Sequence, residues 1–212
     1  LIPFLRYERT PKVAFESLFT LPQLFMEVDI PELSARNVHL QWYSYNDFYQ
    51  QEMRKTLGWF YKLMPNVFPQ QVIERMWTIQ GFLHSDDSPD IRMRFSNNYS
   101  RATLSADSST QARRLFKAVY KKLAGYSSTL GGKPLPFFGR VGTPGGSFHA
   151  GGSFPMAANP AGTQSDLLGR PGGLRRLHVV DASVLPNVAS STITLSIMAN
   201  AHRIGAEFAA HN

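Results

Sequence analysis

A histidine flanked by glycines is the residue of this chain best suited to proton transfer. His149 lies between the pairs Gly145-Gly146 and Gly151-Gly152, and glycines let a backbone approach a ligand closely. A neutral imidazole can take up a proton near neutral pH, which is the chemistry of a general base. A lone histidine in a loop is, however, commonly structural or merely exposed. The residue types alone leave both interpretations open.

The last stretch of the chain, residues 174–212, predicts a strand, a loop and a helix. An apolar run with the length of a strand ends at Asp181, and a helix is expected after it, capped by Ser191 or Thr192. The run is Leu177, Val179 and Val180, and the apolar stripe of the helix is Ile193, Ile197, Ala201, Ile204 and Phe208. A helix N-terminus presents unpaired N–H groups and the positive end of the helix dipole, which suit an electron-rich group.

Two segments of the chain resemble the signatures of one enzyme family. Residues 179–204, VVDASVLPNVASSTITLSIMANAHRI, resemble a VVD-(G/A)-S-x-x-P run that precedes a helix ending in an M-A-x-A-x-R-I-like pattern. Residues 147–156, SFHAGGSFPM, resemble an H-x-x-G-(T/S)-x-x-M segment. Both are signatures of the glucose-methanol-choline (GMC) flavin oxidoreductases, and the two in this order are more specific than either alone. The resemblance covers residues 137–212.

The resemblance implies a catalytic base and an altered second position. His149 matches the family's catalytic histidine, which takes the hydroxyl proton of an alcohol while the substrate carbon gives a hydride to flavin N5. Thr192 stands where the family usually has a second histidine or an asparagine. A threonine can hydrogen-bond a substrate oxygen but cannot be a general base at neutral pH. Thr192 is therefore either a substrate-binding residue or a simple helix cap.

The resemblance also implies that Asp181, Ala182, Thr192, Ile193 and Thr194 bind FAD. Asp181 and Ala182 are expected to lie against the flavin, with the carboxylate in the ribityl and pyrophosphate region. Alternatively, an aspartate at the end of a strand commonly caps the following turn. Ile193 and Thr194 would aim backbone N–H groups at the flavin N1 and O2 edge, where negative charge accumulates on reduction.

A dinucleotide-binding motif is not found in the sequence. Such folds need a strand, G-x-G-x-x-G and a helix, whereas the glycines at 131–132, 142–146, 151–152 and 169–173 have the wrong spacing or no strand before them. The ADP-binding Rossmann half lies at the N-terminus in GMC enzymes, and this chain begins at Leu1. We therefore expect that half in a second chain or in a missing N-terminal segment.

The predicted function is FAD-dependent oxidation of an alcohol, with this chain as one half of the enzyme. The alternatives are a non-catalytic GMC-derived subunit of a larger assembly, and a flavin lyase or decarboxylase of the same fold. The altered position at Thr192 and the missing nucleotide motif favour the non-catalytic subunit modestly. The identity of the alcohol and of the electron acceptor cannot be derived from these residues.

Composition limits the class of protein. With 212 residues, of which 43% are hydrophobic, the chain can bury a globular core. The formal net charge is +7, but the basic residues are scattered, so nucleic-acid binding is not expected. The absence of cysteine excludes disulfides, thiolate metal sites and a cysteine nucleophile. Short apolar runs and the lack of a visible signal peptide predict a soluble or peripheral protein of unknown compartment.

The expected fold class is α+β with an α/β part. Residues 1–136 would form a substrate-binding region with an antiparallel sheet and helices, and residues 137–173 an active-site loop region that carries His149. Residues 174–212 would complete an FAD-binding domain whose Rossmann half is absent from this chain. The run before Asp181 is apolar on both faces, as in a strand with parallel neighbours.

Shorter patterns predict the other elements. Residues 38–45 alternate like a half-buried strand, and residues 76–83 and 91–95 suggest a pair of strands wet on one side. The Asp86-Asp87 turn between those two strands is expected to be solvated. Helices are expected over 48–63 and 107–123, and loops over 131–146 and 157–173, where Asp166 and Arg170 would pair locally.

Overall fold

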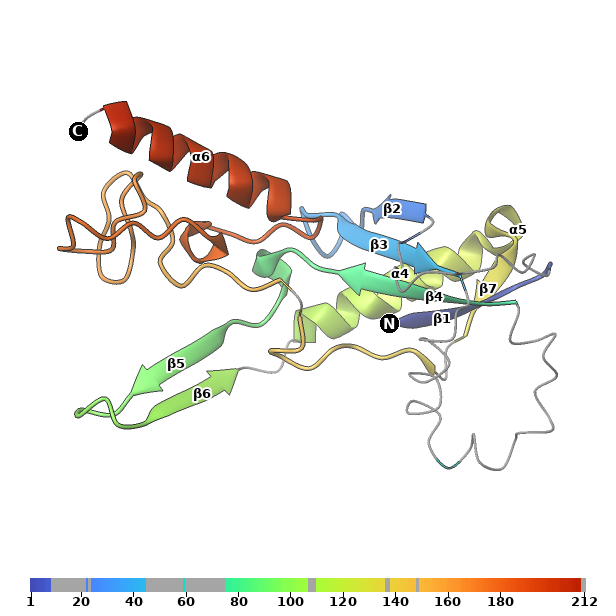
Figure 1. Cartoon of the computed structure of the whole chain (residues 1–212). Coiled ribbons are helices and arrows are strands. Elements are labelled where there is room, and N and C mark those ends of the chain that lie inside the picture. The colour runs from blue at the N-terminus through green and yellow to red at the C-terminus, as the bar shows by residue number, and fades with distance from the viewer. Residues whose placement is uncertain are drawn as a thin grey trace. The chain divides into compact units, whose positions relative to one another are not determined.

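The structure is a computed structural model that describes residues 1–8, 22, 24–44, 59, 75–106, 110–135, 138–147 and 149–210. The chain divides into two compact units. Unit 1 comprises Leu1–Phe82 and Ser109–Gly142, and unit 2 comprises Leu83–Ser108 and Thr143–Asn212. Figure 1 labels the helices and strands of both units. The functional division into residues 1–136, 137–173 and 174–212 stays a prediction.

Unit 1 contains a five-stranded antiparallel sheet. Its strands are β1 (Ile2–Arg6), β2 (Leu24–Val28), β3 (Val38–Tyr43), β4 (Met76–Phe82) and β7 (Gly132–Pro134), in the order β2-β3-β4-β1-β7. Trp42 lies opposite Ile79, and Ile79 lies opposite Ile2. Because directly opposed residues share a face of a sheet, these three side chains form one apolar face. The strand β7 falls within residues 131–146, so the prediction of a continuous loop there is wrong.

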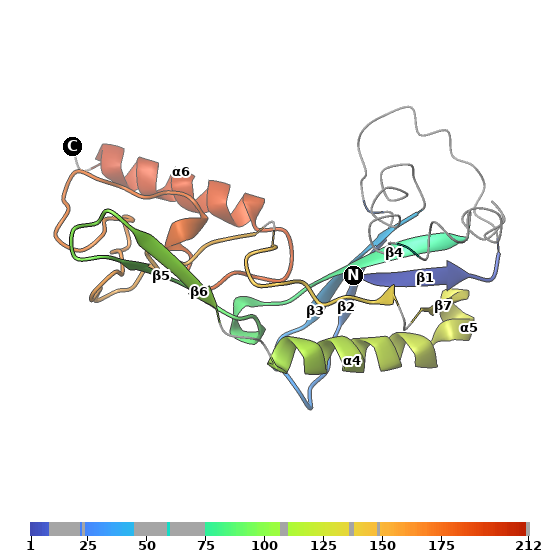
Figure 2. The same ribbon diagram turned by 90° about the horizontal axis from the view of Figure 1, so that it is seen from below.

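Two helices accompany the sheet of unit 1, α4 (Thr110–Gly125) and α5 (Ser127–Leu130). The predicted helix over 107–123 is confirmed from Thr110, and residues 107–109 lie outside the described part. Its buried residues, Ala112, Leu115, Val119 and Leu123, lie three or four positions apart. Figure 2 shows α4 running alongside the sheet, and the Tyr120 hydroxyl donates a hydrogen bond to the carbonyl of Pro134 in β7 (2.8 Å).

The strand β3 is buried on both faces, so the prediction of a half-buried strand is wrong. Its polar face is covered because Phe25 stacks on the His39 ring, and the side chains there satisfy one another. Glu27 Oε1 lies 2.5 Å from His39 Nδ1, and the Gln41 amide nitrogen lies 3.3 Å from His39 Nε2. The Tyr43 hydroxyl donates to Gln41 Oε1 (2.6 Å). Burial raises the pKa of Tyr43, which keeps this hydroxyl a donor.

The predicted pairing of residues 76–83 with residues 91–95 is wrong. β4 pairs with β1 and β3, whereas β5 (Ile91–Phe95) pairs with β6 (Ala102–Ala106) as a separate hairpin in unit 2. The turn between β4 and β5 contains the short 3₁₀ helix η1 (Ser85–Asp87). Asp87 is buried in it, which corrects the prediction of a fully solvated pair. Sequence analysis did not identify β6.

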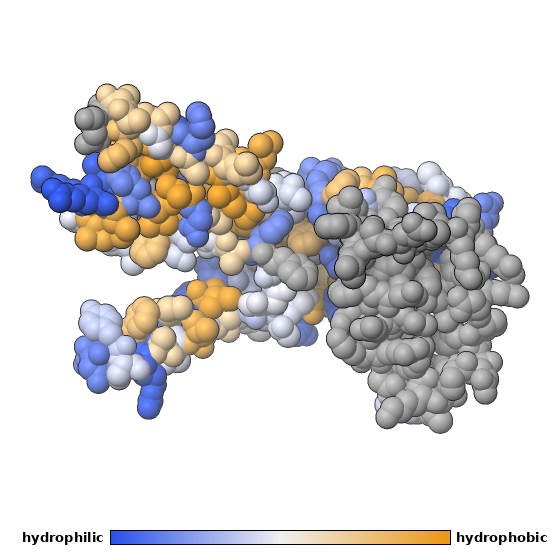
Figure 3. Space-filling view, in the orientation of Figure 1, coloured by the Kyte–Doolittle hydropathy of each residue, from blue (hydrophilic) through white to orange (hydrophobic). Residues whose placement is uncertain are grey.

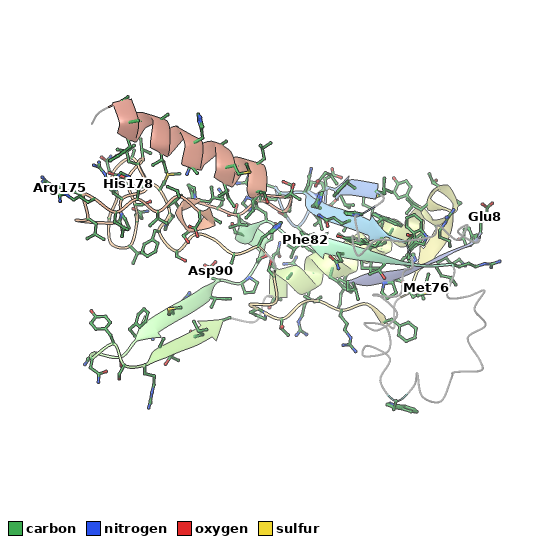
Figure 4. The ribbon with its side chains drawn as sticks, in the orientation of Figure 1. Glu8, Met76, Phe82, Asp90, Arg175 and His178 are labelled. Carbon is green, nitrogen blue, oxygen red and sulfur yellow. The ribbon has the colours of Figure 1, made fainter. Side chains whose placement is uncertain are left out.

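Unit 2 also contains the long helix α6 (Thr194–Ala210) and the short 3₁₀ helix η3 (Ala182–Val184). The predicted C-terminal helix is confirmed. Residues 177–180 pair with no strand of the described chain, and Val179 N donates a hydrogen bond to the carbonyl of Gly169 (2.8 Å). A strand there that completes a sheet of the Rossmann half stays a prediction. The His178 ring packs edge-on against Phe208 of α6, with ring centres 5.2 Å apart. Figure 4 labels His178 beside this helix.

The observed antiparallel sheet with helices matches the expected architecture of the substrate-binding region. The predicted helix over 48–63 lies outside the described residues, apart from Trp59. Among the helices of the described ranges, none combines the length and the apolar character needed to cross a bilayer. The described residues also contain no group of three or more acidic, histidine or cysteine side chains placed to hold a metal ion.

Candidate active site

Three backbone hydrogen bonds join the segment after His149 to the turn after Asp181. Gly152 N donates to the carbonyl of Ala182 (3.1 Å), Phe154 N to that of Ser183 (2.8 Å) and Met156 N to that of Val184 (2.9 Å). The donors lie two residues apart (152, 154 and 156), whereas the acceptors are consecutive (182–184), so an extended segment runs beside the tight η3 turn. We refer to residues 152–156 and 182–184 together as the hydrogen-bonded strip. The structure thus brings together the two sequence motifs, whose side chains gave no sign of a mutual contact.

Gly151 permits the close approach of these two segments. A Cβ atom at this position would lie 2.6 Å from the carbonyl oxygen of Ala182 and 3.0 Å from Cγ2 of Val188. Real Cβ atoms do not approach a backbone oxygen so closely, so any larger residue must push the segments apart. The glycine pair beside His149 therefore has a local structural reason in addition to any role toward a ligand.

We predict that Gly151→Ala lowers the free energy of unfolding by about 1–3 kcal/mol, the usual cost of overpacking. The added methyl group overlaps backbone, which cannot rotate away as a side chain could. Urea denaturation followed by circular dichroism measures the change. Gly142→Ala is the matched control, since a Cβ there meets nothing within 4 Å. Equal stability of the two variants would show that the close approach is not maintained.

His149 is partly exposed and is held at its backbone. Its N–H donates to the Ser147 hydroxyl oxygen (3.1 Å). Ser147 was not singled out from the sequence, although a serine two residues before a loop residue commonly forms such a turn. His149 therefore lies between a short turn at Ser147 and the hydrogen-bonded strip that begins at Gly152.

Asp181 caps the η3 turn. Its Oδ1 accepts a hydrogen bond from Ser183 N (3.0 Å), and the residue is exposed. Ala182 and Val184 are buried. The capping interpretation of Asp181 is confirmed, and a role toward FAD remains a prediction. The two uses are compatible, because a carboxylate has a second oxygen and further lone pairs.

The start of α6 carries the other predicted cofactor residues. Ile193 is buried and its carbonyl accepts the bond from Ile197 N (3.0 Å), while Thr192 and Thr194 are exposed. In the described part of the chain, the hydroxyls of Ser191 and Thr192 make no capping hydrogen bond to the first turn. The first N–H groups of a helix have no intrahelical acceptor, so this end fits an electron-rich group. Thr192 is not part of the strip that joins the His149 and Asp181 segments.

The loop between η3 and α6 is anchored from η1. Ser85 N donates to the carbonyl of Val188 (2.9 Å), and Val188 N donates to Ser85 Oγ (3.0 Å). This reciprocal pair fixes the loop that leads to Thr192. Sequence analysis missed Ser85, because its partner lies far along the chain.

Ser165, which sequence analysis did not identify, and Arg203 of α6 also make contacts in this part of unit 2. Ser165 is fully buried, and its hydroxyl donates to the carbonyl of Phe154 (2.7 Å). Arg203 of α6 donates to the carbonyl of Leu167 and to Asn200 Oδ1. Together they connect the strip, the 157–173 loop and the helix.

The predicted pairing of Asp166 with Arg170 is confirmed. Asp166 Oδ1 accepts from the backbone N–H groups of Leu168 (2.9 Å) and Arg170 (3.0 Å), and Oδ2 accepts from Arg170 Nε (2.7 Å). Partial burial alone would raise the pKa of Asp166, but the hydrogen bonds and charge of Arg170 lower it below its usual value. The carboxylate therefore organises the loop in its ionised form.

A glycine-rich histidine loop and a turn before a long helix are the elements that the two sequence motifs predicted, and the structure joins them by hydrogen bonds. The family model described as GMC oxidoreductase matches residues 78–201. This match covers more than half of the chain, so the chain belongs to the GMC oxidoreductase family. It corresponds to the C-terminal portion of a GMC oxidoreductase. The resemblance inferred from the two motifs is confirmed. No curated protein matches the sequence.

Proposed function

We propose that this chain supplies the substrate-binding and C-terminal part of an FAD-dependent enzyme that oxidises an alcohol. The observation that carries the proposal is the hydrogen-bonded strip between the His149 segment and the Asp181 turn. It supports the proposal because a proton acceptor and a candidate cofactor-facing turn are built on one backbone scaffold. The family supports a redox reaction, since the chain belongs to the GMC oxidoreductases.

In this proposal His149 is the general base. Its imidazole takes the proton of the substrate hydroxyl, and the turn at Ser147 and the strip from Gly152 onward orient the ring. The chemistry that FAD supplies when bound is acceptance of the hydride that leaves the alcohol carbon. Loss of the proton and of the hydride together convert the alcohol into a carbonyl compound.

The residues proposed to hold FAD are Asp181, Ala182, Thr192, Ile193 and Thr194. The exposed start of α6 can offer N–H groups and the positive end of the helix dipole to the flavin edge, which favours negative charge there. Thr192 adds a hydroxyl that can hydrogen-bond the substrate oxygen. It accepts no proton in this scheme, so His149 carries proton transfer alone.

A surface of unit 2 fits a partner that brings the ADP-binding half. Leu195 and Met198 lie one turn apart on α6 and are 78% and 62% exposed, and Leu177 and Val180 are also exposed. Large apolar side chains on a helix and on the segment beside it are usually covered in a complete protein. We propose that the ADP-binding half, in a second chain or in a further segment of the same polypeptide, covers them.

The test is the absorption spectrum of the natively purified protein, together with the intact mass of every chain present. We expect flavin bands that an alcohol bleaches, and a polypeptide region with a dinucleotide-binding motif. A colourless protein would contradict the enzymatic function and favour a non-catalytic subunit. Bound flavin that alcohols fail to bleach would favour a lyase or decarboxylase. Full FAD occupancy of residues 1–212 alone would contradict the need for a partner half.

A further inference from the structure

The thioether of Met156 lies against two nitrogen donors of α6. The Asn200 amide nitrogen is 4.0 Å from the Met156 sulfur, and Arg203 Nη2 is 3.8 Å from it. Met156 is also the last donor of the hydrogen-bonded strip, since its N–H bonds to the carbonyl of Val184 (2.9 Å). Around α6, Figure 3 shows hydrophilic residues among apolar ones. The sulfur therefore has polar neighbours where most methionines have only apolar ones.

Arg203 fixes the orientation of the Asn200 amide. Arg203 Nη2 and Nε both donate to Asn200 Oδ1, at 2.9 and 3.3 Å. The amide oxygen must face the guanidinium, because an arginine offers donors and no acceptor, and the amide NH₂ group then points to Met156. In the part of the chain that the structure describes, the Met156 sulfur is the only acceptor found for this NH₂ group. A thioether is a weak acceptor, so the donor is held against a sulfur that can use it only poorly.

A sulfoxide oxygen on Met156 would be a much better acceptor for these donors. Both nitrogens lie on one side of the sulfur, because Arg203 Nη2 is hydrogen-bonded to the same amide that offers the NH₂ group. An oxygen added on that side would come within about 3 Å of both nitrogens, the normal length of an N–H···O hydrogen bond. Nη2 already donates to the carbonyl of Leu167 and to Asn200 Oδ1. Asn200 would therefore supply the main hydrogen bond, and Arg203 positive charge and a shared hydrogen.

We propose that Met156 is a site of oxidation to methionine sulfoxide, and that Asn200 and Arg203 bind the sulfoxide oxygen. The oxidant is hydrogen peroxide, which can reach the side chain because Met156 is partly exposed. An S–O bond forms while the O–O bond breaks. The sulfur loses two electrons, and the other peroxide oxygen leaves as water with both hydrogens. The oxidised side chain links the end of the strip to α6, and methionine sulfoxide reductases can reverse the change.

The stereochemistry of the product tests this site without any need for flavin. Oxidation makes the sulfur a stereocentre, and donors on one side favour one epimer. The natively purified protein is treated with hydrogen peroxide and digested. Mass spectrometry then follows each sulfoxide during reduction by the two classes of methionine sulfoxide reductase, each specific for one epimer. We expect an excess of about fivefold for one epimer at Met156, equivalent to about 1 kcal/mol, the net value of one hydrogen bond.

Internal controls and a matched variant show whether the donors cause this excess. Met93 and Met198 are 56% and 62% exposed and should give both epimers in similar amounts. Asn200→Asp keeps the shape of the side chain and an acceptor for Arg203 but has no N–H donor, so the excess at Met156 should disappear. The absence of sulfoxide at Met156, equal epimers there, or the same excess in Asn200→Asp would overturn the proposal.

The stability of the oxidised protein gives a second test. A sulfoxide usually disrupts packing because it makes an apolar side chain polar, but a bound sulfoxide oxygen should not. Urea denaturation is measured before and after peroxide treatment for the parent protein and for Met156→Leu, which cannot be oxidised at this position. We expect peroxide to shift the urea midpoint equally in both. A larger loss in the parent protein would mean that the oxygen on Met156 is not bound, and would overturn the proposal.

Discussion

Replacing His149 with alanine is expected to slow the reduction of bound flavin by an alcohol by about 100- to 10,000-fold, the usual contribution of a general base. The imidazole is the proposed acceptor of the hydroxyl proton, and without it the alcohol must lose its proton to water. Stopped-flow absorbance of the flavin under anaerobic conditions measures the rate. The FAD content of the variant should equal that of the parent protein, because His149 is not among the residues proposed to hold FAD.

Three observations distinguish lost proton transfer from a damaged site. Added imidazole should restore part of the rate in His149→Ala, since the space left by the ring can admit it. His202→Ala removes an exposed histidine of α6 and should leave the rate unchanged. Thr192→Val should reduce the rate less than His149→Ala, because the threonine is proposed only to hydrogen-bond the substrate. Full activity of His149→Ala would contradict its role as the base.

The two long helices α4 and α6 were predictable because their signal is local. In α4, Ala112, Leu115 and Val119 recur at the spacing of an α-helix, and all are buried. Of the stripe predicted for the C-terminal helix, Ile193 and Ile204 are buried, Ile197 and Ala201 are partly buried, and Phe208 is exposed. Each position contacts neighbours three or four residues away, so a short window of sequence contains most of the information.

The strands were less predictable because their partners are distant in the sequence. β1 pairs with β4 and β7, which lie far along the chain, and no pattern within Ile2–Arg6 specifies either. Residues 76–83 and 91–95 are close in sequence and both alternate, yet they belong to different sheets. Residues 177–180 have the composition of a buried strand but no sheet to join in the described chain. Composition predicts a strand only when partners for it are present.

The sequence motifs located the segments of the candidate site but not the contacts between them. The resemblance identified the segments of His149 and Asp181, but their contact is made by backbone groups of residues 152–156 and 182–184. Backbone hydrogen bonds leave little trace in side-chain types. The traces that exist are Gly151, where a Cβ would meet a carbonyl oxygen, and Ser165, a buried hydroxyl that needs a partner.

Gly169→Ala is expected to be the most destabilising of these substitutions, with a loss of about 3 kcal/mol or more in the free energy of unfolding. Gly169 has a φ of +69°, which is unfavourable for alanine, and its Cβ would overlap the carbonyl oxygen of Val179 and lie 3.3 Å from Cδ1 of Ile204. Relieving the overlap must disturb the hydrogen bond from Val179 N to the carbonyl of Gly169. Gly162→Ala separates the two causes, because its φ is +60° but a Cβ there meets nothing within 4 Å. The control should therefore lose only about 1–2 kcal/mol from backbone strain. Urea denaturation of both variants measures the difference. Equal losses would mean that the close contact between Gly169 and Val179 does not constrain this loop.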